Sequence, residues 1–286
     1  GDLFELQTTY PNEGLTNLSY FSPAYFRLFA QFTGNNDWLD VVDRGYEIAE
    51  LSQTAIAGNC TGFVPNWSKY NGEAQTPTFT YNNPELWGFD AVRYAWRVAL
   101  DRYWFDSAAS ITALDRIGSF YATVGMADVK SEYSLDGTFD LLTADYTNGF
   151  FLGNIAPAIW AAETLTPVTC GQADGLMVRA NAQQAYNRLN NQGLENYYSD
   201  SWRVLGMALM AGRFYNPLAS VPPVSDPGDC NADSLIDSGD LSAINLELSN
   251  PGSFTATGCD ANESGSVDGA DRTCIRQKIF DPSATC

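Results

Sequence analysis

The sequence predicts an all-α fold in two parts. Apolar residues recur at helical spacing through residues 1–219, and neither βαβ alternation nor a ladder of hairpins is visible. Residues 220–228 contain three prolines and no apolar periodicity, which indicates a short extended linker. Residues 229–286 contain two similar acidic stretches. We therefore expect a large helical domain followed by a small independent module.

The larger part has seven segments with a helical pattern. Ser22 followed by Pro23 is typical of a helix start, because proline suits the first helical position, and Ser199 is expected to cap the last helix. Long polar or aromatic loops are expected at 54–85 and 126–149. The predicted helices are 22–33, 37–53, 86–104, 107–123, 151–163, 172–191 and 199–214.

The composition excludes several classes of function. Fifteen Lys and Arg against 34 Asp and Glu give a net charge of −19, so neither nucleic acid nor an anionic membrane is an expected partner. No run of about 18 apolar residues could span a bilayer, and no signal-like leader opens the sequence. With no histidine and no CxxC pair, zinc and Cys-His chemistry are not expected.

The cysteines and sequons favour a secreted protein. An even number of widely spaced cysteines is typical of disulfides, which persist in oxidising compartments. Glycosylation sequons begin at Asn17, Asn59 and Asn66. The cysteines are Cys60, Cys170, Cys230, Cys259, Cys274 and Cys286.

Two twelve-residue stretches of the tail have the spacing of calcium loops. They read DCNADSLIDSGD at 229–240 and DANESGSVDGAD at 260–271. A hard cation takes oxygen ligands at loop positions 1, 3, 5, 9 and 12, with a backbone carbonyl at position 7. Ser264 replaces a carboxylate at position 5 of the second loop, so we expect that Ca²⁺ site to be the weaker of two. The predicted ligands are Asp229, Asn231, Asp233, Asp237, Asp240, Asp260, Asn262, Ser264, Asp268 and Asp271.

The tail resembles a type I dockerin, a module with paired EF-hand-like loops. The resemblance implies that calcium folds the module and that a helix face, near Ser238-Gly239 and Gly269-Ala270, binds a cohesin domain of another protein. Its four cysteines depart from the usual pattern, so the tail could instead be a stapled structural module without a cohesin partner. One of the 15 possible pairings is Cys60–Cys170, Cys230–Cys259 and Cys274–Cys286.

Four segments of the larger part resemble, in order, the second half of a family-8 glycoside hydrolase. They read NLSYFSPAYFRLFA at 17–30, GFVPNWSKYNG at 62–72, WGFDAVRYAWRVALDRYW at 87–104 and YYSDSWRVLGMALMAGRF at 197–214. The resemblance implies part of an (α/α)6 helical toroid and inverting hydrolysis of a β-linked polysaccharide. The predicted helices are too few to close a complete toroid.

Within that resemblance, Asp90 is the expected general base and Arg93 orients it. A carboxylate at a helix N-terminus is kept ionised by the dipole, as a base requires. The alternative is a plain ion pair between residues three apart. Phe89 stands where family members usually have tyrosine. Aromatic side chains stack on sugar rings, and the candidate platforms are Tyr20, Trp67, Tyr70, Tyr81 and Trp87, whereas Trp96 and Trp104 are expected in the core.

The general acid is missing from the matched segments. Inversion needs a second carboxyl group about 6.5–9.5 Å from the base. A separate polypeptide could supply it, Glu13 or Glu85 could replace it, or the chain could be a non-catalytic descendant. The rival hypothesis is a structural subunit that self-assembles through its half-toroid and tail, with fibres as one outcome. A third possibility is a glycan-binding module that does not hydrolyse its ligand.

Overall fold

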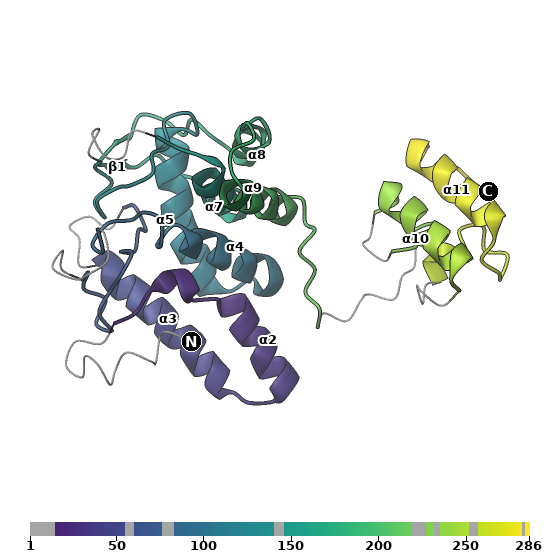
Figure 1. Cartoon of the computed structure of the whole chain (residues 1–286), viewed down its shortest axis with the longest axis horizontal. Coiled ribbons are helices and arrows are strands. Elements are labelled where there is room, and N and C mark those ends of the chain that lie inside the picture. The colour runs from purple at the N-terminus through teal and green to yellow at the C-terminus, as the bar shows by residue number, and fades with distance from the viewer. Residues whose placement is uncertain are drawn as a thin grey trace. The chain divides into compact units, whose positions relative to one another are not determined.

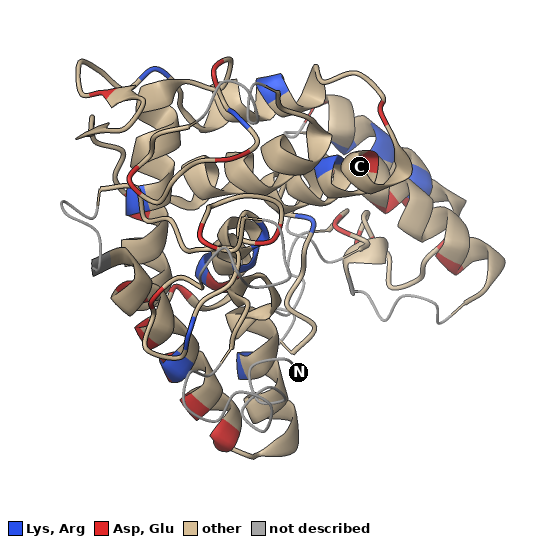
Figure 2. Ribbon diagram, turned by 60° about the vertical axis from the view of Figure 1, so that its left-hand side comes forward, with Lys and Arg blue, Asp and Glu red and all other residues tan. Residues whose placement is uncertain are grey.

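The computed structural model describes residues 15–54, 60–75, 83–139, 146–218, 227–231, 235–251, 257–281 and 284–286. The chain divides into two compact units, Gly1–Leu218 and Ala219–Cys286, and both consist mainly of helices (Figure 1). Within the described ranges, every helix is too short or too polar to cross a membrane. Lys and Arg are scattered as blue segments among the acidic residues (Figure 2).

Unit 1 is built from helices that pack in a continuous series. Helices α2 and α3 pack against each other, and α4 packs against α2, α5 and α7. Helix α7 in turn packs against α8 and α9 (Figure 1). A two-stranded antiparallel hairpin pairs Thr169 with Asp174 and Cys170 with Ala173. The elements are η1 (Leu18–Tyr20), α2 (Pro23–Thr33), α3 (Asp37–Thr54), α4 (Arg93–Phe105), α5 (Ala108–Val124), α7 (Gly149–Ala161), β1 (Thr169–Cys170), β2 (Ala173–Asp174), α8 (Ala182–Asn190) and α9 (Tyr197–Met210).

Three asparagines set helix starts that the sequence analysis misplaced. The Asn148 side chain accepts hydrogen bonds from the first turn of α7, so this helix begins before the predicted residue 151. Asn181 starts α8 with a capping box, and the predicted helix 172–191 is wrong in its first half, where the β-hairpin lies. Asn196, and not Ser199, caps α9.

The predicted helix 86–104 is also wrong at its start, because α4 begins only at Arg93. Residues 86–92 form turns, and Trp87 pairs with Tyr133 in an isolated bridge. At other positions, residues that are typical of helix ends do begin or end the helices. Pro23 occupies the first turn of α2, Gly34 ends that helix with a φ of 70°, and Ser107 caps α5.

The core of unit 1 is dense in aromatic side chains. The rings of Phe63 and Trp87 stack with centroids 4.6 Å apart, and Phe120, Tyr121 and Tyr133 surround them. Trp96 is buried, as predicted. Trp104 is partly buried, and its indole N–H donates to the carbonyl of Phe214 at 2.6 Å. Through Phe63, these rings join the 60–75 loop to α5 and to the segments that carry Trp87 and Tyr133.

A fully buried carboxylate connects the helices at the other end of this core. Asp101 of α4 accepts hydrogen bonds from Arg27 Nε of α2 at 2.9 Å and from Tyr46 Oη of α3 at 2.7 Å. It also accepts one from Ser107 Oγ, the cap of α5, at 2.7 Å. Each donor stabilises the buried charge, so the carboxylate fixes four elements at one point.

Unit 2 contains α10 (Ser238–Ser249), η2 (Thr257–Cys259) and α11 (Gly269–Phe280). Ile244 of α10 and Ile275 of α11 are buried in a small core of their own. The chain forms three disulfides, Cys60–Cys170, Cys230–Cys259 and Cys274–Cys286. This is the pairing singled out from the sequence, and it is confirmed.

Glycines allow α7 and α9 to pack closely, which gives a stability prediction. A Cβ at Gly206 of α9 would overlap the carbonyl oxygen of Gly153 on α7, whereas a Cβ at Gly193 would meet open space. We expect Gly206→Ala to lower the free energy of unfolding by about 1–3 kcal/mol through overpacking. The control Gly193→Ala should change it by less than about 0.5 kcal/mol in urea denaturation. Equal stability of the two variants would contradict this close contact.

Candidate functional site

Asp90 lies in a tight turn that is organised by the side chain of Asn66. The amide oxygen of Asn66 accepts the backbone N–H groups of Gly88 at 3.2 Å, Asp90 at 3.0 Å and Ala91 at 2.9 Å. Its amide nitrogen donates to the carbonyl of Asn83 at 2.9 Å. One buried side chain therefore holds both ends of the turn, and residue 90 stands just before α4 and not within it.

The Asp90 carboxylate is oriented by two donors. Its Oδ1 lies 2.5 Å from Arg93 Nη2, and its Oδ2 accepts the indole N–H of Trp67 at 3.1 Å. The side chain is still 34% exposed, so solvent can reach its remaining lone pairs. The predicted pairing of Asp90 with Arg93 is thus present. Such a carboxylate is fixed in direction yet able to accept a proton from a water molecule.

Arg93 and Arg97 extend this polar site along α4. The Arg93 guanidinium carbon lies 5.4 Å from the centroid of the Tyr20 ring, in a cation–π arrangement. Arg97 follows one turn later and contacts the hydroxyl of Ser22. Burial lowers the pKa of Arg97, and the positive charge of Arg93 lowers it further. Asp90 therefore lies beside two partly buried arginines, the first of which packs on the Tyr20 ring.

The predicted aromatic platforms lie in different environments. Tyr20 and Tyr70 are exposed, and Trp67 is almost buried with its N–H on Asp90. Trp87 is only 1% exposed, stacks on Phe63 and donates to the Tyr121 hydroxyl at 2.7 Å. The prediction that Trp87 stacks on a sugar is wrong, because its ring belongs to the core. Tyr81 lies outside the described residues.

The sequence analysis missed an aromatic group beside Asp90. Phe89 is 46% exposed and stacks on Phe150, with centroids 5.3 Å apart. Tyr198, also exposed, lies 5.0 Å from the same ring. Tyr198 lies in the quoted segment 197–214, so the sequence offered a signal from which it could have been found. The role of Asn66 could not be found in this way, because it depends on a contact between residues that are distant in the sequence. Phe89 and Tyr198 thus pack against the buried Phe150 ring and leave exposed aromatic surface near Asp90.

Two further carboxyl groups lie on segments that adjoin this turn. Glu85 belongs to a segment whose carbonyls, at Pro84 and Leu86, accept from the backbone of residues 66–67 at 2.9 and 2.7 Å. The Oε2 atom of Glu85 is buried and lacks a hydrogen-bond partner in the described chain. Glu132 Oε1 accepts from Asn83 at 3.0 Å. Glu13 lies outside the described residues.

The two sequon asparagines that the structure describes are not exposed on the surface. Asn17 and Asn66 are both buried, and their side-chain oxygens accept backbone N–H groups. Neither amide can carry a bulky glycan in this fold. Asn59 lies outside the described residues.

The two acidic loops of unit 2 share one geometry. Asp240 Oδ1 accepts the N–H of Asn231 at 3.0 Å, and its Oδ2 accepts that of Asp237 at 2.8 Å. In the second loop Asp271 makes the equivalent bonds with residues 262 and 268 at 3.1 and 2.8 Å. The aspartates at positions 9 and 12 also form a capping box in both loops. The loops are therefore structural repeats.

The side-chain oxygen atoms of these loops are of the kind that bind a hard cation. Asp260 accepts the N–H groups of Ser264 at 2.8 Å and Gly265 at 2.7 Å, which folds the second loop around its first carboxylate. Aspartate, asparagine and serine oxygens are the ligands that Ca²⁺ prefers. Among the described residues, no three Asp, Glu, His or Cys side chains converge as a metal cluster, and Asp233 lies outside them.

Comparisons place these features beside known proteins. A family model described as glycosyl hydrolases family 8 matches residues 8–212. Endoglucanase C of Ruminiclostridium cellulolyticum is 31% identical over 242 residues, which cover 82% of this chain and 47% of that protein. Endoglucanase A of Acetivibrio thermocellus is 29% identical over 249 residues, covering 82% and 48%. The chain thus spans about half the length of these relatives.

Solved structures show the same fold. A β-1,3-1,4-glucanase from Paenibacillus sp. X4 superposes with a TM-score of 0.57 at 19% identity, over 71% of this chain and 51% of that one. A GH8 xylobiose complex from Teredinibacter turnerae gives a TM-score of 0.54 at 16% identity, over 70% and 47%. The helices of unit 1 therefore correspond to part of a helical toroid.

The role of Asn66 can be tested by two substitutions of similar size. Asn66→Ala removes the acceptor of three N–H groups, and we expect the free energy of unfolding to fall by roughly 1–3 kcal/mol or more. Asn66→Asp keeps an acceptor and loses only the donor to Asn83, so its loss should be smaller. Chemical denaturation measures both. Equal losses would show that the shared acceptor does not hold the turn.

Proposed function

The chain belongs to the glycosyl hydrolases of family 8, and we propose that it hydrolyses a β-linked polysaccharide with Asp90 as the general base of an inverting reaction. The observation that carries this proposal is the Asp90 carboxylate, held by Arg93 and Trp67 while a third of it remains exposed. The chain spans about half the length of its relatives, so the activity of a whole family member is part of this proposal.

In the proposed reaction, Asp90 accepts a proton from water as the water oxygen bonds to the anomeric carbon. The glycosidic C–O bond breaks on the opposite face, and a carboxylic acid donates a proton to the departing oxygen. Asp90 ends protonated and the acid ends ionised, so solvent exchange restores both groups. Arg93 keeps the carboxylate oriented before the attack.

The mechanism also needs a general acid, and Glu85 is our candidate for it among the described residues. Its segment pairs with residues 66–67, which also hold Asp90, and its Oε2 has no hydrogen-bond partner there. A carboxyl group without a competing partner is free to donate its proton. Glu132, bound to Asn83, is the alternative on the neighbouring segment.

The aromatic surface near Asp90 fits a sugar chain. Exposed rings at Tyr20, Phe89 and Tyr198 offer apolar faces to pyranose rings, while arginines at 93 and 97 offer donors to hydroxyl groups. The relatives named endoglucanase and the structure titled as a xylobiose complex support a β-glucan or a xylan as the substrate. Their enzymatic names favour hydrolysis over the scaffold hypothesis.

The tail is proposed to bind two Ca²⁺ ions and to attach the chain to a partner. The matched hydrogen bonds of Asp240 and Asp271 support a pair of equivalent loops. When bound, calcium would cross-link loop oxygens and stabilise unit 2. A cohesin-like domain, or another copy of the chain, is the proposed partner of its helices. Three disulfides support secretion into an oxidising compartment.

Catalysis is tested by reducing-sugar release from soluble β-glucan and xylan. We expect Asp90→Asn to lower the rate by about 10²–10⁴-fold, because proton abstraction is lost. Glu85→Gln should lower it similarly if Glu85 is the acid, whereas the exposed control Glu163→Gln should not. Full activity of Asp90→Asn would remove Asp90 from the mechanism. No release by the folded wild-type chain would contradict hydrolysis by this chain alone.

Calcium binding is tested by calorimetry on chain stripped with a chelator. We expect two equivalents of Ca²⁺, with the second loop weaker because Ser264 adds no charge. Asp260→Asn should weaken only that site by more than about tenfold. Glu263→Gln removes the same charge from an exposed non-ligand position and should leave both sites intact. A single equivalent, or unchanged binding by Asp260→Asn, would contradict the paired sites.

A further inference from the structure

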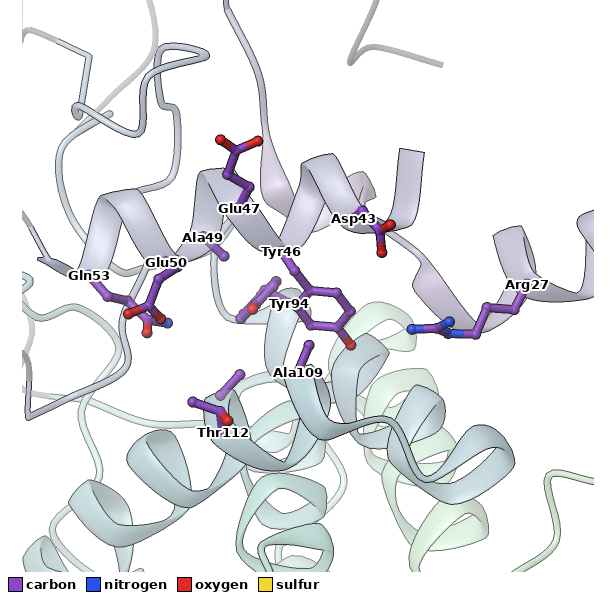
Figure 3. Close-up of a pocket in the computed structure, with 11 residues that line it drawn as sticks. Arg27, Asp43, Tyr46, Glu47, Ala49, Glu50, Gln53, Tyr94, Ala109 and Thr112 are labelled. Carbon is purple, nitrogen blue, oxygen red and sulfur yellow. The ribbon is translucent and has the colours of Figure 1, made fainter. Parts of the chain in front are cut away.

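A pocket whose lining does not include Asp90 lies between α3, α4 and α5. Its volume is about 380 Å³, within the usual range for a small-molecule site. Figure 3 shows Tyr46 pointing from α3 across the pocket, with Tyr94 behind it, Glu50 toward one end and Arg27 toward the other. Asp43 of α3 also lines the pocket. The site is thus built from rigid helices and not from loops.

Three of the hydrogen-bond donors that line this pocket are already engaged. Arg27 Nε and the Tyr46 hydroxyl both donate to the buried Asp101 carboxylate, at 2.9 and 2.7 Å. The Gln53 side-chain amide donates to the carbonyl of Gly62 at 2.7 Å. A ligand rich in acceptors would have to displace these bonds. The pocket therefore favours a ligand that brings its own donors.

Two acceptors of the lining, the Tyr94 hydroxyl oxygen and the Asp43 carboxylate, remain available. Tyr94 is completely buried, and its hydroxyl has no hydrogen-bond partner within the described part of the chain. Burial raises the pKa of this hydroxyl, and the negative charge of Glu50 raises it further, so it stays neutral. A buried hydroxyl without a partner costs free energy that a bound donor would recover.

The charge of the lining is negative. Asp43, Glu47 and Glu50 are spaced four and three residues apart, which places them on one face of α3. Glu47 pairs with Arg44, and Glu50 pairs with Arg116 at 2.6 Å. Asp43 has no ion-pair partner in the described chain, while the lining's one cation, Arg27, is neutralised by Asp101.

We propose that this pocket binds a small organic cation with a primary ammonium group. The ammonium carries three N–H donors, which suit the Tyr94 hydroxyl oxygen and the α3 carboxylates. The ring of Tyr46, which points across the pocket, adds a cation–π attraction. An anion would be repelled by the α3 carboxylates, and a neutral polyol would gain no charge attraction from Asp43. A linear diamine and an amino sugar both carry this group.

Titration calorimetry on the full chain distinguishes binding of a linear diamine from binding of an amino sugar. The probes are 1,5-diaminopentane, glucosamine and, as a neutral analogue of the same size, glucose. We expect at least one amine to bind with a stoichiometry of one, and glucose not to bind. Binding of the diamine alone identifies a free amine, and binding of glucosamine alone identifies an amino sugar. Absence of amine binding, or equal binding of glucose, overturns the proposal.

Two substitutions locate the binding in the pocket. Tyr94→Phe removes only the unpartnered hydroxyl, so the chain should fold with an unchanged or higher melting temperature while amine affinity falls about tenfold. Asp43→Asn removes an exposed carboxylate and should weaken binding several-fold. Glu163→Gln makes the same charge change outside the lining and should have no effect. Undiminished binding by both pocket variants would overturn the proposal.

Discussion

The buried Asp101 carboxylate is the interaction on which the arrangement of unit 1 depends. A charge removed from water must be compensated by donors, and here they come from Arg27, Tyr46 and Ser107 on three different elements. The direction of α4 is thereby fixed against α2, α3 and the start of α5. Since α4 carries Arg93 at its first turn, the same constraint sets where the guanidinium meets the Asp90 carboxylate. It also holds the Tyr46 ring across the acidic pocket.

A second constraint acts on Trp67, the other hydrogen-bond partner of the Asp90 carboxylate. The 60–75 loop supplies Asn66 and Trp67, and it must be held in place although it has no regular helix. The Cys60–Cys170 disulfide joins it to the β-hairpin, Thr61 donates to the carbonyl of Leu135 at 2.7 Å, and Phe63 is stacked in the aromatic core. These three ties hold the irregular loop in place, so that Asn66 and Trp67 can position the Asp90 carboxylate.

The sequence predicted those features that depend on local chemistry. Pro23 gave the start of α2, and the Asp90 to Arg93 spacing gave the ion pair. The turn at 86–92 was missed because its backbone donors are captured by Asn66, more than twenty residues earlier, a contact that no local pattern records. Trp87 was misassigned for a related reason. An aromatic residue beside a loop reads as exposed until the rings that cover it are known.

The two units are stabilised in different ways, and this bears on how their functions can be linked. Unit 1 has an extended aromatic core, whereas the buried apolar residues of unit 2 are few and include Ala243, Ala261 and three cysteines. A core of that size gives little hydrophobic stabilisation, so the disulfides stabilise unit 2 to a larger degree than unit 1. If the tail binds calcium as proposed, loss of the ion would destabilise the tail and leave the Asp101 network of unit 1 intact. On that proposal, calcium would act on attachment to a partner and not on hydrolysis.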